Sequence, residues 1–196
     1  KDRVSYQDLR DHQSMTDNAY GYQDVLFTDT QGNPMKATVV DTMARLDLPT
    51  PLPSGGSVSF NVNWAFNIIE EAAVGGRGGY ERFYDNKTDI FFLAQWFPRL
   101  AAYTDYSGWN NKAFLGRGEF TLEFGNYDVE LTVPDNHIVS ATGKLANPEA
   151  VLTQVQRQRL KNAGTKQPVF VVPSEEALAS EQTEAAGAKT WPFKSE

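Results

Sequence analysis

The sequence predicts an all-β protein, mostly antiparallel, with a β-sandwich or saddle architecture and one helical insertion. Three observations predict this class. Short segments in which apolar and polar residues alternate recur over residues 25–147. Clusters of Gly, Pro and Asn separate those segments and are typical of turns. A single stretch, residues 148–164, instead has the apolar spacing and the end signals of a helix.

The predicted strands follow in chain order. Apolar segments at 25–27 and 38–40 flank the turn cluster 31–34, and residues 58–64 alternate with a period of two. Residues 120–124 and 127–133 alternate on either side of Gly125-Asn126, so we expect them to form a β-hairpin. The first 24 residues show no such pattern and are expected to be an irregular lead-in to a single domain, residues 1–196.

The helical insertion is predicted over residues 148–164. Asn147 suits the N-cap, Pro148 suits the first helical position and Gly164 is a natural stop. Beyond the helix, residues 165–196 are expected to hold the final strands and a short helix. In that region, residues 168–172 are typical of a buried strand between two prolines, and 174–186 of a short helix. The last extended segment contains Trp191-Pro192-Phe193.

Composition excludes several classes of function. The 196 residues carry a net charge of −7, which disfavours nucleic-acid binding because phosphate contacts need clustered Lys and Arg. No apolar run approaches the ~20 residues that cross a bilayer. The absence of Cys excludes disulfides and thiolate metal sites. A hydrolytic zinc site usually uses two or more His and would here require both His12 and His137, which lie 125 positions apart, so such a site within this chain is disfavoured.

The chemical motifs of common enzymes do not occur in the sequence, which has no His-Glu-x-x-His, no Gly-x-Ser-x-Gly and no phosphate-binding loop. The sequence therefore assigns no catalytic residue, no metal ligand and no cofactor site. The remaining polar features are interpreted as loop, turn or solvent-facing residues: Gly75–Gly79, Asp128, Glu130, Glu70, Glu71, His12, His137 and the glycosylation-type triplet Asn86-Lys87-Thr88.

Aromatic residues concentrate in residues 91–127, which hold 11 of them in 37 positions. Two interpretations stay open for this segment. It forms sandwich core plus an interface, or it forms an aromatic-lined platform for a sugar or a peptide. Around Trp96 bulky residues occupy consecutive positions, which is typical of a segment covered on both faces.

A series of short motifs resembles the N-terminal domain of the aminopeptidase N family, which are gluzincin zinc metallopeptidases, and in particular a bacterial branch of it. Each motif is short, and their order and spacing over residues 25–195 make the resemblance specific. The motifs are Ala94-Gln95-Trp96-Phe97-Pro98-Arg99, Ala102-Tyr103-Thr104-Asp105, Gly108-Trp109, Gly118-Glu119-Phe120, Phe124-Gly125-Asn126-Tyr127-Asp128-Val129, Val133-Pro134, Ala141-Thr142-Gly143 and Thr190-Trp191-Pro192-Phe193-Lys194.

The resemblance implies a non-catalytic domain of a zinc-dependent aminopeptidase. In the family, the zinc ligands and the catalytic Glu lie in the domain that follows the β-domain, and their motifs do not occur here. The implied partners are that catalytic domain, on the same polypeptide, and a peptide substrate, whose access to the cleft the β-domain narrows. Zinc is expected in the catalytic domain and not in this chain. The family resemblance and the first residue, Lys1, favour a periplasmic or extracellular location, with a cytoplasmic one left open.

Two residues are implied to line the pocket for the substrate's amino terminus. Gln95 matches the Gln of a family strand that faces this pocket, where an amide binds an amine without needing a charge. Phe97 stands where many relatives have Glu or Gln, which implies an apolar pocket wall in place of an amine anchor. Thr104 likewise stands where family members often have Cys.

Two alternative functions from other classes remain. In the first, the chain is a free-standing carbohydrate- or peptide-binding β-sandwich that uses exposed Trp96, Tyr106 or Trp109. In the second, it is an assembly domain that dimerises through the aromatic segment. The binding-module hypothesis requires these rings to be exposed, whereas an ordinary core would bury them. The dimerisation hypothesis is tested by the molecular mass of the chain in solution.

Overall fold

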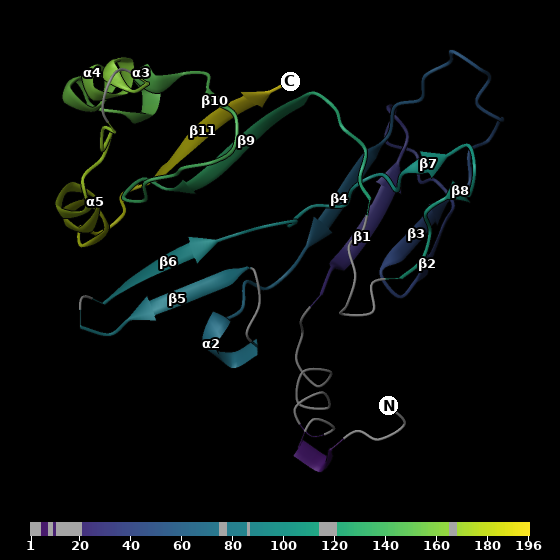
Figure 1. The fold of residues 1–196 in the computed structure, drawn as a ribbon, viewed down its shortest axis with the longest axis horizontal. Helices are drawn as coiled ribbons and strands as arrows, with labels where there is room; N and C mark the ends of the chain where they lie inside the picture. Colours follow the sequence, from purple (N-terminus) through teal and green to yellow (C-terminus); the bar gives the residue numbers. More distant parts are fainter. Residues whose placement is uncertain are drawn as a thin grey trace. The chain divides into compact units, whose positions relative to one another are not determined.

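The computed structural model of the chain describes residues 5–7, 10, 21–74, 78–85, 87–113, 121–164 and 168–196. These residues are rich in β-structure, as expected, and their strands form small sheets (Figure 1). The chain divides into two compact units. The N-terminal unit comprises residues 1–81 and 90–123, and the C-terminal unit comprises residues 82–89 and 124–196.

The N-terminal unit contains two antiparallel sheets of two strands each in its first part. Strand β1 (Gln23–Thr28) pairs with β4 (Asn61–Ala65), and β2 (Ala37–Val40) pairs with β3 (Met43–Leu46). The turn predicted at 31–34 is confirmed, since the Asp29 carboxylate accepts hydrogen bonds from the backbone N–H groups of Gln31 and Asn33. The segment predicted as a strand from residue 58 becomes regular only at Asn61, where pairing with β1 begins.

Two further pairs follow along the chain. After the short helix α2 (Glu71–Val74), strand β5 (Gly79–Phe83) pairs with β6 (Thr88–Phe92). Strand β7 (Tyr103–Thr104) forms a tight antiparallel hairpin with β8 (Gly108–Trp109).

The C-terminal unit is built on a three-stranded sheet in the order β10-β11-β9 (Figure 1). Strand β9 (Tyr127–Pro134) pairs antiparallel with β11 (Ala188–Ser195), and β10 (Lys144–Leu145) covers the other edge of β11. The burial of β9 alternates along all eight residues, so one face packs inward and the other meets solvent. The extended segment predicted around Trp191-Pro192-Phe193 is confirmed as β11.

The hairpin predicted for residues 120–124 and 127–133 is wrong. Strand β9 pairs instead with β11, in a continuous register from Tyr127 opposite Ser195 to Pro134 opposite Ala188. In residues 121–126, Leu122 forms an isolated antiparallel bridge with Ala101 and so pairs with a segment other than β9. A distant strand that matches all eight positions of β9 provides more pairing than the short local segment could.

The helix predicted over 148–164 is two helices, α3 (Pro148–Val151) and α4 (Gln154–Asn162). Leu152 adopts an extended conformation, and the Thr153 hydroxyl then accepts a hydrogen bond from the Gln156 backbone N–H. The Gln156 side chain accepts one in return from the Thr153 N–H, which completes a capping box and restarts the helix. Asn147, the predicted cap, makes no side-chain capping bond.

The buried strand predicted at 168–172 is also wrong. Residues 168–170 are exposed loop, and Val171 and Val172 form a bend whose side chains pack against the core of the unit. The Val171 carbonyl accepts a hydrogen bond from Arg159 of α4, so a side chain satisfies it in place of a ladder partner. The short helix predicted after it is confirmed as α5 (Ser174–Glu181), although it ends five residues earlier than expected.

The core of the C-terminal unit lies between α3 and β11. Val151 and Leu152 pack on Trp191 and Phe193, and all four side chains are buried. Partly buried side chains from the strands, loops and α4 surround them: Leu131, Val133, Ile138, Val139, Leu145, Leu160, Val171 and Val172. Burying a side chain of this size contributes roughly 1.5–3 kcal/mol, so the four buried side chains make a large contribution to the unit's stability.

Candidate functional site

Gln95 and Phe97 lie in the loop that follows β6. The resemblance implied a strand position for Gln95, but the structure places it in a bend, with an exposed side chain and a φ of 55°. A left-handed φ is uncommon for a residue other than Gly, Asn or Asp. Phe97 is half-buried, and its ring meets that of Trp96 edge-on, with 5.2 Å between centroids. Gln95 and Phe97 therefore lie in the same loop, but the Gln95 side chain is exposed whereas the Phe97 ring is half-buried against Trp96.

Trp96 belongs to a chain of touching aromatic rings in the N-terminal unit. Its ring centroid lies 6.2 Å from that of Trp64 on β4, and Trp64 in turn lies 6.4 Å from Tyr22. Tyr22 also meets Phe66 edge-on at 5.9 Å. These contacts leave Trp96 half-buried, so it acts as packing and not as the exposed ring that the binding-module hypothesis expects. Pattern reasoning missed this cluster because its members are far apart in sequence.

Arg99 connects the same loop to residues 121–123. Its guanidinium donates a hydrogen bond to the Glu123 carbonyl at 2.7 Å, and its central carbon lies 5.9 Å from the centroid of the Phe97 ring. The Glu123 carboxylate accepts a hydrogen bond from the Tyr103 backbone N–H at 3.2 Å. Arg99 and Glu123 therefore hold the loop after β6, the start of β7 and residues 121–123 together.

The β7–β8 hairpin carries three exposed aromatic residues of the predicted segment. Tyr103 and Trp109 are direct cross-strand neighbours, and their rings meet edge-on at 5.2 Å. Both are more than half exposed, and Tyr106 in the turn is 87% exposed. Edge-to-face pairing leaves ring faces open to solvent, where a sugar or an apolar side chain could stack. Phe114 and Phe120 of the same segment lie outside the described residues.

Two of the motifs that carry the family resemblance meet in the C-terminal unit. Gly143, which ends the Ala-Thr-Gly motif, lies against Lys194 of the Trp-Pro-Phe-Lys motif on β11. A Cβ atom built on Gly143 would stand 2.6 Å from the Lys194 carbonyl oxygen, and Gly143 has a φ of +99°. Both features require glycine at this position. The close approach lets β10 begin at Lys144, directly opposite Lys194.

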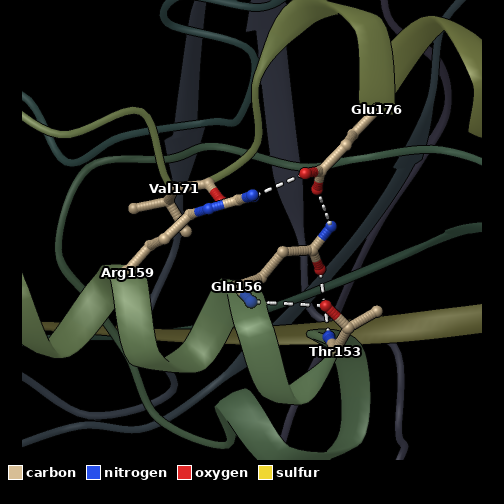
Figure 2. Close-up of polar contacts among 5 residues, drawn as sticks. All are labelled: Thr153, Gln156, Arg159, Val171 and Glu176. Atoms are coloured by element: carbon tan, nitrogen blue, oxygen red, sulfur yellow. Dashed lines mark hydrogen bonds and ion pairs between the residues drawn. The ribbon is translucent and has the colours of Figure 1, made fainter.

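A polar network joins α4 to α5 in the C-terminal unit (Figure 2). The Glu176 carboxylate accepts hydrogen bonds from Arg159 at 2.6 Å and from the Gln156 amide at 3.1 Å. Gln156 is buried, and its amide oxygen also closes the capping box with Thr153. The hydrogen bonds from Arg159 and then Gln156 hold the pKa of the Glu176 carboxyl below its ordinary value. A carboxylate kept ionised in this way holds the two helices together and is poorly suited to act as a general base.

Replacing Glu176 by glutamine is expected to lower the unfolding midpoint at neutral pH, because the amide cannot accept from Arg159 as a carboxylate does. A lowered pKa in the folded state stabilises the fold fully above the ordinary value of 4.5, and this contribution is lost as pH falls toward the folded pKa. The difference between wild type and Glu176→Gln should therefore shrink as the pH falls through the ordinary value of 4.5 toward the lower pKa of the folded state. Thermal unfolding followed by circular dichroism across this range measures it.

The matched control is Glu175→Gln, which changes the neighbouring exposed carboxylate. It should shift the midpoint less than Glu176→Gln at neutral pH. Equal shifts for the two variants, or a difference that does not depend on pH, would contradict the role of the ion pair.

The other polar candidates form no common site among the residues that the structure describes. Asp128 pairs with Lys194 across the β9–β11 ladder at 2.8 Å, and His137 Nδ1 shares a hydrogen bond with Asn136. Glu70 forms a parallel bridge with Tyr80. His12, Asn86 and residues 75–77 of the glycine-rich loop lie outside the described residues. These positions agree with the structural roles that the sequence assigned to Asp128, Glu70 and His137.

An open hollow of about 330 Å³ lies beside the β5–β6 pair and is lined by Arg82, Tyr84, Lys87 and Asp89. The Arg82 guanidinium donates two hydrogen bonds to the Asp89 carboxylate, each of 2.8 Å. These hydrogen bonds hold the pKa of the Asp89 carboxyl below its ordinary value. The charges of Arg82 and Asp89 offset each other, so the net positive charge of the lining comes from Lys87. Among the residues that the structure describes, no group of three or more His, Asp or Glu side chains is placed to hold a metal ion.

No described helix has the length and the apolar character needed to cross a membrane. Comparison of the chain with protein-family models, with curated proteins and with solved structures finds no match.

Proposed function

We propose that this chain is a non-catalytic N-terminal β-domain of an aminopeptidase N-like zinc metallopeptidase. The observation that carries the proposal is the ordered series of motifs between Ala94 and Gly143, continued at Thr190–Lys194. In this proposal the small antiparallel sheets belong to one saddle or sandwich, and the catalytic zinc belongs to a separate domain of the same polypeptide. The corresponding location is the periplasm or the cell exterior.

The packing of the motif residues supports the proposal. Gly143 is required by the close approach of the Lys194 carbonyl, and Tyr103 pairs directly with Trp109. Within each unit, therefore, short motifs that are separated in sequence depend on one another for their packing. Such dependence is a physical reason for the motifs to occur as a set, which is the basis of the resemblance.

Exposed apolar side chains in the N-terminal unit also support the proposal. That unit buries only Phe27 and Ala102 among the apolar residues that the structure describes. Many of its large apolar side chains are exposed, among them Leu26, Val39, Val40, Ile68, Leu93 and Leu100. Extensive exposed apolar surface is typical of protein that packs against another domain.

In the proposed role the domain narrows the catalytic cleft and lines the pocket for the substrate's amino terminus. Gln95 offers an exposed amide, whose oxygen can accept a hydrogen bond from an amine. Phe97, held by Trp96 and beneath Arg99, offers an apolar wall. Neither residue carries out chemistry, so their effects should appear in substrate binding.

The first test is the coding sequence beyond Glu196. A His-Glu-x-x-His motif followed by a later Glu is expected there. Its absence would overturn the proposal. The second test incubates the purified chain with zinc and with aminoacyl chromogenic substrates, and no turnover is expected. Zinc-dependent turnover by the purified chain would show that catalysis does not depend on a separate domain.

The decisive test uses the full-length enzyme. Gln95→Ala and Phe97→Ala are expected to raise KM for aminoacyl substrates by roughly 3- to 10-fold with kcat nearly unchanged, because a hydrogen bond or an apolar contact contributes about 1 kcal/mol. Phe124→Ala is the matched control, since that ring is fully exposed and lies outside the loop. Values of KM like that of the control for both variants would overturn the role of this loop in the pocket.

A second candidate function is a carbohydrate- or peptide-binding module, favoured by the exposed rings of Tyr103, Tyr106 and Trp109 on one hairpin. Soluble cello-oligosaccharides and an oligoproline peptide should then change the tryptophan fluorescence of the chain at ligand concentrations of about 1–10 mM or below. The change should be lost in Trp109→Ala and kept in Phe124→Ala. No response to either ligand would count against this function and leave the first proposal unaffected.

A further inference from the structure

We draw no further inference here: the strongest candidate, the outer edge of strand β9 in the three-stranded sheet, carries none because nothing in the described part of the chain shows what covers that edge.

Discussion

Replacing Trp191 by alanine is expected to unfold the C-terminal unit or to destabilise it by about 3–5 kcal/mol. Trp191 is 1% exposed and is the largest fully buried side chain among the described residues. Its ring lies between α3 and the sheet, where it contacts the cluster of Val151, Leu152 and Phe193. Domains of ordinary size are stable by only about 5–15 kcal/mol, so this loss is a large fraction of the total. Urea unfolding followed by far-ultraviolet circular dichroism measures it.

The matched control is Phe170→Ala, an aromatic residue of the same unit whose side chain is exposed. Its cost should stay within about 0.5 kcal/mol. A third variant, Trp191→Phe, keeps a ring in the core and removes a buried indole N–H that has no hydrogen-bond partner in the described structure. It should cost clearly less than Trp191→Ala. If Trp191→Ala cost no more than Phe170→Ala, the core assignment would be wrong.

Replacing Gly143 by alanine is expected to destabilise the same unit by about 2–5 kcal/mol. The added Cβ would lie 2.6 Å from the Lys194 carbonyl oxygen, which is backbone of β11 and cannot rotate away. The φ of +99° adds a conformational cost for any residue with a side chain. Relief of the clash requires β10 to separate from β11. Urea unfolding and hydrogen exchange of the β10 and β11 amides measure the two consequences.

Gly164→Ala isolates the conformational cost. Gly164 also has a positive φ, of +82°, but its added Cβ would meet nothing within 4 Å. Its substitution should therefore cost about 1 kcal/mol and leave exchange in the sheet unchanged. Equal costs at Gly143 and Gly164 would mean that the close approach to Lys194 contributes nothing.

The β-rich class and several elements could be predicted from the sequence, because alternation and turn residues act over a few positions. The turn at 31–34, the extended segment at 191–193 and the helix after Pro173 are examples. Strand pairing could not be predicted in the same way. The partner of β9 lies more than fifty residues away at β11, and the local turn signal at Gly125-Asn126 favoured the wrong neighbour.

The split between α3 and α4 shows a different limit. The sequence pattern of apolar residues continues through residues 148–164, and Asn147 has the right chemistry for a cap. Thr153 and Gln156 nevertheless satisfy each other's backbone groups, and that reciprocal pair starts a second helix. The Thr-x-x-Gln spacing is a capping-box signal in the sequence, and it would have located this break.

The candidate site was predictable only in part. The resemblance is the basis for proposing the loop that contains Gln95 and Phe97 as part of a pocket, but it did not predict the conformation of that loop. The aromatic cluster of Tyr22, Trp64 and Trp96 depends on strand β4 and on the loop after β6, which only folding brings together. That packing decides which aromatic rings are exposed and could contact a ligand. Trp96 is half-buried by its neighbours, whereas Tyr106 and Trp109 remain exposed.

By itself, the sequence determined the β-rich class and the acidic composition without cysteine, and it contains the set of motifs on which the proposed aminopeptidase N-like domain rests. These properties are local or compositional, so they can be read from the chain directly. Only the tertiary structure decided that β9 pairs with β11, that Trp191 is the centre of a core, and that Gly143 must lack a side chain. Each of these depends on contacts between residues far apart in sequence, whose energies arise only once the chain has folded.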